Sequence, residues 1–153
     1  MSKLDFLEKT LTIADGCFFA AGQDYSKLPV EMSNFLHVYS AQGAIDNGGF
    51  NYFFQNDWPE KPSYSVFILA YHSIGCHAVA DALSKIVALF PFKDPQLYCK
   101  KRRQYISKHW DKERLAPSTW PSNIFSHHGV EDALIHYVLK HKDIFKITFE
   151  YDG

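Results

Sequence analysis

The sequence predicts an all-α fold in a single compact domain of about six helices. Apolar residues recur at intervals of three and four over most of the chain, which is the spacing of one helix face. Gly, Pro and Asn residues separate these stretches. Of 153 residues, 46% are hydrophobic and 22% are charged, which is typical of a globular protein. A chain of this length forms one ordinary domain, so we assign residues 1–153 to it.

The first predicted helix runs from about residue 3 to Gly16, and residues 17–28 are expected to form an irregular link. A second helix is predicted over residues 29–46, where Pro29 suits a first helical turn. The apolar residues of this second helix keep helical spacing: Met32, Phe35, Leu36, Tyr39, Ala44 and Ile45.

An Asn47-Gly48-Gly49 corner follows the second helix. Asn and Gly tolerate the left-handed backbone that ends a helix, so the corner predicts a change of direction into a short new helix. Phe50, Phe53 and Phe54 fall on one face of that helix, which ends near Asn56. A phosphate-binding loop would follow a strand and would carry a different glycine pattern, so we favour a structural corner.

The second half of the chain is predicted to hold three further helical regions. Residues 57–62 form a surface link, and the apolar segment 64–90, interrupted by Gly75, forms one kinked helix or two helices. We expect this segment to be the most buried element. A basic helix is expected over residues 95–109, a loop over 111–128 and a last helix from about residue 130. For residues 145–151 we favour helix over strand.

Charge and cysteine content narrow the function classes. The formal net charge is −1, so no overall field favours nucleic acid or an anionic membrane, and direct nucleic-acid binding is not expected. The longest apolar runs fall short of the roughly 20 residues that cross a bilayer. The three widely spaced cysteines match no disulfide framework, and the N-terminus lacks a signal-peptide pattern. These features predict a cytoplasmic protein.

Metal and catalytic sites find little support in the sequence. His72 and Cys76 lie four residues apart and His77 follows, but no glutamate lies between them to act as a base. His127 and His128 form a second histidine pair. For both groups we favour core or surface residues over metal ligands. We therefore expect no catalytic residue, no metal and no cofactor.

Two features are candidates for a partner surface. Trp58 is a residue type that often anchors protein interfaces, and we expect exposed aromatic residues between Phe50 and Trp58. The second candidate is the basic run of Lys100, Lys101, Arg102 and Arg103, which suits an acidic protein surface better than nucleic acid. The aromatic content of 16% also makes a homodimer an alternative.

The corner carries a family resemblance. The chain resembles the DNA mimic protein 19 family of bacterial proteins over residues 30–150, most specifically through these residues: Asn47, Gly48, Gly49, Phe50, Tyr52, Phe53, Phe54 and Asn56. The resemblance implies an all-α fold without known enzymatic activity. The family is named after an acidic member that presents carboxylates in place of DNA phosphates to a DNA-binding protein.

The combined prediction is a non-enzymatic protein-interaction module of a bacterial cytoplasm, with another protein as its partner. A local DNA mimic would need the acids between Asp5 and Glu60 to converge on one face. A toxin-neutralising immunity protein and a metal-dependent hydrolase are two further hypotheses.

Overall fold

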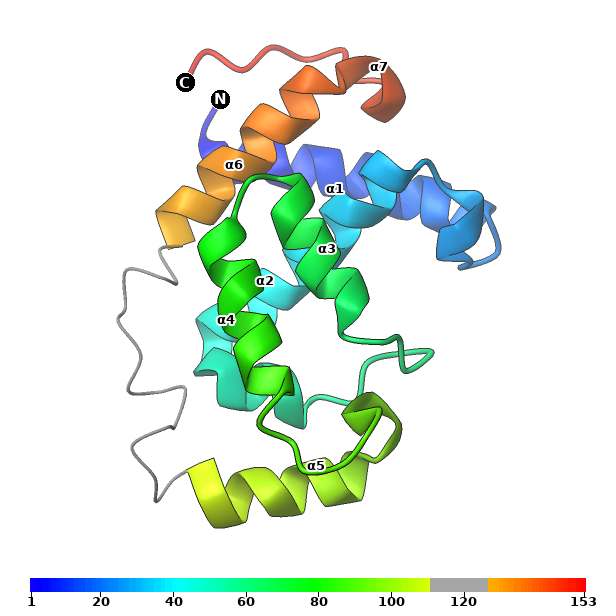
Figure 1. The fold of residues 1–153 in the computed structure, drawn as a ribbon. Helices are drawn as coiled ribbons and strands as arrows, with labels where there is room; N and C mark the ends of the chain where they lie inside the picture. Colours follow the sequence, from blue (N-terminus) through cyan, green and yellow to red (C-terminus); the bar gives the residue numbers. More distant parts are fainter. Residues whose placement is uncertain (111–126) are drawn as a thin grey trace.

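The computed structural model describes residues 1–110 and 127–153, and these residues form seven α-helices and no strand (Figure 1). The prediction of an all-α fold is confirmed. The helices are α1 (Lys3–Ala20), α2 (Val30–Gln55), α3 (Ser65–Ser73), α4 (His77–Val87), α5 (Cys99–Tyr105), α6 (His127–Lys140) and α7 (Lys142–Phe145). Almost all of the predicted loop 111–128 lies outside the described residues.

Helix α1 begins with a capping box and ends later than predicted. The Asp5 N–H donates to Ser2 Oγ at 3.1 Å, while the Ser2 N–H donates to the Asp5 carboxylate at 3.2 Å. The predicted end at Gly16 is wrong, because Gly22 ends the helix instead. Gly22 has φ 70°, and the Gln23 N–H after it donates to the Phe18 carbonyl at 2.9 Å.

Helix α2 is the centre of the molecule. It packs against α1, α3, α5, α6 and α7, and it contributes eleven buried residues to the core. Segment 64–90, which was expected to be the most buried element, also contains eleven buried residues, so burial is shared between it and α2. The buried residues of α2 surround the helix axis instead of forming one narrow stripe, which lets this helix contact several neighbours.

The Asn-Gly-Gly corner lies inside α2. Gly48 (φ −159°, ψ 16°) and Gly49 (φ 69°, ψ −167°) leave the helical region of backbone space, and the helix resumes at Phe50. The Asn47 side chain donates to the Gly43 carbonyl at 2.8 Å, before the break. A Cβ atom on Gly48 would lie 2.5 Å from the Tyr52 Cβ, so the backbone at the break approaches the next turn closely.

Segment 64–90 forms two helices, which is one of the two predicted arrangements. Helices α3 and α4 separate at Gly75 and lie side by side (Figure 1). The Cys76 N–H donates back to the Tyr71 carbonyl at 2.9 Å, which satisfies a carbonyl at the end of α3.

The basic segment and the C-terminal segment are less regular than predicted. Residues 95–110 form a 3₁₀ turn (Pro95–Leu97), helix α5 and a π turn (Ile106–Trp110). After α7, residues 146–153 form neither helix nor strand, so the favoured helix at 145–151 is wrong beyond Phe145. The tail follows the N-terminal helix instead, because the Phe149 and Tyr151 rings pack 5.4 Å and 5.1 Å from the Phe6 ring.

Candidate functional site

The phenylalanines of the corner belong to the core. The exposed fractions of Phe50, Phe53 and Phe54 are 4%, 1% and 0%, so our expectation of exposed aromatics from Phe50 onward is wrong for these three. Helix periodicity explains the result, since i, i+3 and i+4 share the face that turns inward. Tyr52, on the other face, is exposed.

Arg102 is not a surface residue, which corrects the predicted basic partner surface. Its side chain is 1% exposed and lies at the C-terminal end of α2. The guanidinium donates four hydrogen bonds of 2.8–3.1 Å, to the backbone carbonyls of Phe54, Asn56, Pro95 and Gln96. Asp57 lies 3.5 Å away. A buried cation here compensates the partial negative charge of the helix end, which explains its burial.

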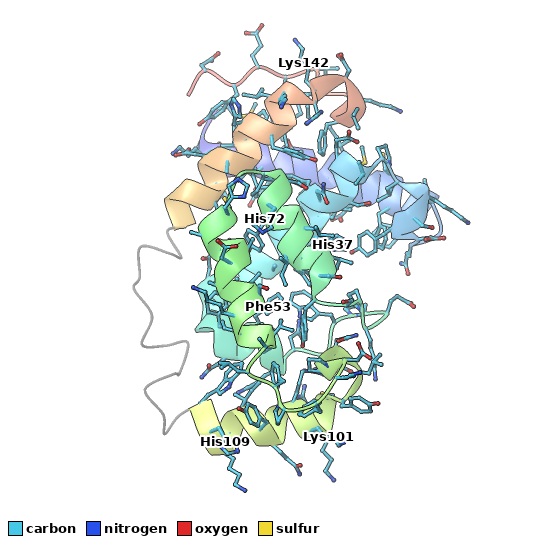
Figure 2. All side chains as sticks on the ribbon, in the orientation of Figure 1. His37, Phe53, His72, Lys101, His109 and Lys142 are labelled. Atoms are coloured by element: carbon cyan, nitrogen blue, oxygen red, sulfur yellow. The ribbon has the colours of Figure 1, made fainter. Side chains whose placement is uncertain are left out.

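The other three basic residues of the run stay exposed on α5. Arg103 donates to the Gln55 carbonyl at 3.0 Å, beside the bonds of Arg102. Lys101 lies on α5 (Figure 2). Its ammonium is 5.1 Å from the Tyr98 ring centre and 5.7 Å from that of Phe92. Two of the four cations therefore bind α2, and a third covers aromatic rings.

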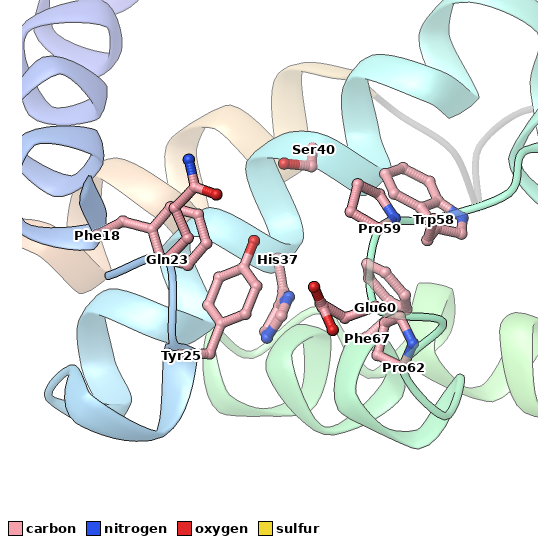
Figure 3. A pocket seen from close by; sticks show the side chains of 10 residues that line it. All are labelled: Phe18, Gln23, Tyr25, His37, Ser40, Trp58, Pro59, Glu60, Pro62 and Phe67. Atoms are coloured by element: carbon pink, nitrogen blue, oxygen red, sulfur yellow. The ribbon is translucent and has the colours of Figure 1, made fainter. Parts of the chain in front are cut away.

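Trp58 forms part of the wall of a surface hollow. Its indole N–H donates to the Phe53 carbonyl at 3.1 Å, and its ring packs 5.1 Å from the Phe67 ring. The hollow has a volume of about 370 Å³, within the range of ligand pockets. Figure 3 shows its lining: Phe18, Gln23, Tyr25, His37, Ser40, Trp58, Pro59, Glu60, Pro62 and Phe67.

Aromatic rings in contact with one another line this aromatic hollow. Tyr25 stacks on Phe18 with the ring centres 4.4 Å apart, and it contacts the His37 ring at the same distance. His37 meets the Phe67 ring edge-on at 5.5 Å. The rings come from α1, from the 3₁₀ turn Tyr25–Lys27, from α2 and from α3, so each ring is held by a different element.

Burial sets the charge state of the hollow. Loss of solvent lowers the pKa of His37 from 6.5 to about 4, so this imidazole is neutral at pH 7. Burial also raises the pKa of Tyr25, and the negative charge of Asp15 adds to the shift. Glu60 is the one carboxylate among the residues that line the hollow.

A tight turn presents Glu60 to the hollow. The Lys61 N–H donates to the Trp58 carbonyl at 3.0 Å, which closes the turn over Pro59 and Glu60. Glu60 has φ 65°, a left-handed conformation that costs a residue with a side chain about 1–2 kcal/mol. Its carboxylate points into the hollow (Figure 3).

Of the residues that line the hollow, the sequence indicated Trp58 as a site candidate. Phe18, Tyr25, His37, Glu60 and Phe67 were missed, because they are far apart in the chain and form no motif. The sequence did contain one indication that Glu60 lies in a surface turn, because Pro59 and Pro62 flank it and prolines favour turns.

His72 and His77 form a pair at the turn between α3 and α4. Their Nδ1 atoms lie 2.7 Å apart, and His72 Nε2 lies 3.7 Å from the Asp81 carboxylate. Burial raises the pKa of the Cys76 thiol. Within residues 1–110 and 127–153, no group of three or more His, Cys, Asp or Glu side chains is placed to hold a metal ion. The side chains of His127 and His128 lie outside the described part.

These features define a class: an all-α protein built on a kinked central helix, with an aromatic hollow at its surface. The chain belongs to the DMP19-like protein family, whose match spans residues 26–141. This match confirms the resemblance that the corner indicated. No curated protein and no solved structure matches the chain. None of the helices in the described part of the chain is long and apolar enough to cross a membrane.

Proposed function

We propose that this protein is a non-enzymatic interaction module of the bacterial cytoplasm, and that the aromatic hollow receives part of a partner protein. The observation that carries the proposal is the hollow itself, a cavity of about 370 Å³ walled by Trp58, Tyr25, Phe18 and Phe67. Tyr and Trp are the side chains that contribute most to binding energy at protein interfaces.

Two further observations support this proposal. The resemblance to the DNA mimic protein 19 family implies a protein partner for a chain of this kind. Cys17, Cys76 and Cys99 are free thiols, which fits a reducing compartment.

Three of the eight acids in the first sixty residues have roles in local structure, which favours the hollow over a DNA-like face. Asp5 completes the capping box of α1, and Asp24 caps the 3₁₀ turn by accepting from the Ser26 N–H at 3.0 Å. Asp57 lies against buried Arg102. Each of these carboxylates thus has a local structural partner.

Selection of peptides from a random display library on the full chain tests the proposal. Ser40 is exposed on α2 at the edge of the hollow, so Ser40→Trp fills the hollow and leaves the core intact. Ser84→Trp places the same bulk on an exposed position of α4 and is the matched control. We expect binding peptides that Ser40→Trp abolishes and Ser84→Trp leaves unchanged. If every recovered peptide binds Ser40→Trp as well as the parent chain, the proposal is wrong.

A further inference from the structure

The aromatic hollow contains a carboxylate without a partner. Glu60 makes no hydrogen bond or ion pair with any residue in 1–110 or 127–153, although its carboxylate points into the hollow (Figure 3). Asp24 and Asp57, which lie elsewhere, both have partners. An unpaired carboxylate beside apolar walls is complementary to a positive charge.

The walls of the hollow favour a cation for a second reason. The face of an aromatic ring is electron-rich, and a cation within about 6 Å of the ring centre is attracted to it. Trp58, Tyr25, Phe18 and Phe67 supply four such rings around one cavity. This attraction is strongest where water is excluded.

Neighbouring charges add to this preference. His37, the one basic group among the lining residues, is neutral at pH 7 and does not repel a cation. Asp15 acts electrostatically on Tyr25, so its negative charge reaches the wall of the hollow.

From these observations we propose that the aromatic hollow is a cage for a cationic side chain, the lysine or arginine of a basic segment in a partner protein. This inference rests on the proposed function, because it names the chemistry of the group that the hollow receives. The methylene stem of the lysine or arginine packs against the rings, and its charged end reaches the Glu60 carboxylate. A neutral or acidic side chain would leave Glu60 unpaired or would repel it.

A pair of small probes separates charge from shape. Choline and 3,3-dimethylbutan-1-ol have nearly the same shape, but only choline carries a positive charge. Titration of the full chain with each probe, followed through the NMR signal of the Trp58 indole N–H, measures both affinities. We expect choline to bind about tenfold more tightly than the alcohol. Equal affinities, or no shift with choline, would overturn the inference.

Substitutions locate the charge effect in the hollow. Glu60→Gln removes the charge and keeps the shape, and we expect it to weaken choline binding about three- to tenfold. Glu150→Gln, an exposed glutamate of the C-terminal tail, is the matched control and should change nothing. If Glu60→Gln and Glu150→Gln bind choline equally, the assignment of Glu60 is wrong.

The display experiment distinguishes failure of the cage from failure of the proposed function. Peptides that Ser40→Trp blocks should share a Lys or Arg and should bind Glu60→Gln more weakly. Blocked peptides with an apolar residue in that place, and equal affinity for Glu60→Gln, overturn the cage but leave the interaction function standing. Absence of any blocked peptide overturns both the partner assignment and the proposed function, even if choline binds.

Discussion

Two neighbouring regions of this molecule each contain a charged side chain, but the two side chains differ in whether the protein itself supplies hydrogen-bond partners. At the C-terminal end of α2, Arg102 is buried and its guanidinium donates to four backbone carbonyls. At the aromatic hollow, a few residues further along the chain, Glu60 points into a cavity and has no partner in the described part of the chain. A charge with all its hydrogen bonds made holds the fold together, while a charge without them is available to a ligand.

The two regions should therefore respond differently to substitution. Changes at the Arg102 end should cost the most stability, and a change at Glu60 in the hollow should alter binding while stability stays nearly the same. The expected loss of stability is largest at Arg102, smaller at the break in α2 and at His37, and smallest at Glu60.

Replacing Arg102 should have the largest effect. Arg102→Leu leaves four backbone carbonyls, two of them buried, and Asp57 without their cation, so we expect a loss of about 3–5 kcal/mol in the free energy of unfolding, measured by urea denaturation. Arg103→Leu is the control, because Arg103 is exposed and makes one hydrogen bond to α2. Arg103→Leu should lower the free energy of unfolding by less than about 1 kcal/mol. Equal losses would remove the contrast between buried and exposed cations.

Substitution at the break in α2 should cost stability too, but less than replacement of Arg102. Gly49 has φ 69° and ψ −167°, a conformation that residues with a Cβ atom rarely adopt. We expect Gly49→Ala to cost about 2 kcal/mol in the same measurement. Gly43→Ala, within the regular part of α2 and with open space around it, should instead gain up to about 1 kcal/mol. A stable Gly49→Ala variant would show that α2 does not need its kink.

His37 should make stability depend on pH. Its pKa is about 4 in the folded chain and near 6.5 in the unfolded chain, so between these values the unfolded chain binds more protons. Stability should therefore rise with pH from about 4 to 6.5 and level off above. Because the ring is partly exposed, we expect this contribution to be about 1–2 kcal/mol.

Denaturation of the parent chain and of His37→Leu at pH 7 and pH 4.5 isolates this contribution. The parent chain should lose more stability than the variant over this interval. Identical losses would mean that His37 remains accessible to protons in the fold.

Replacing Glu60 should have the smallest effect on stability. Because the carboxylate makes no interaction with the described residues, Glu60→Gln should change the free energy of unfolding by no more than about 0.5 kcal/mol. A loss as large as that of Arg102→Leu would show that Glu60 holds the fold, and the two regions would no longer differ.

Much of the fold could be predicted from short stretches of the sequence. The Asn-Gly-Gly break, the division at Gly75 and the start of α2 all depend on residues adjacent in the chain, and short-range rules apply to them. The end of α1 was misplaced because Gly16 and Gly22 look alike in sequence. Only the backbone bonds that follow Gly22 identify it as the end of the helix.

The candidate site could not be predicted in the same way. Lys100–Arg103 is a uniform basic run, and nothing adjacent to Arg102 indicates that the carbonyls of α2 surround it. The lining of the hollow likewise depends on how α1, α2 and α3 pack, because Phe18, His37 and Phe67 lie far apart in the chain. Trp58 was selected as a candidate only because tryptophan often anchors interfaces, and residue type alone does not predict which side chains surround it.

The bonds of Arg102 also set an order of events when the chain is made. A ribosome adds residues 54–56 before residue 102, so the last turn of α2 is synthesised before the side chain that later completes it. Contacts between distant residues form late in folding, because the intervening chain must first be ordered. Newborn chains that stall before residue 102 should therefore keep this turn open to proteases and chaperones.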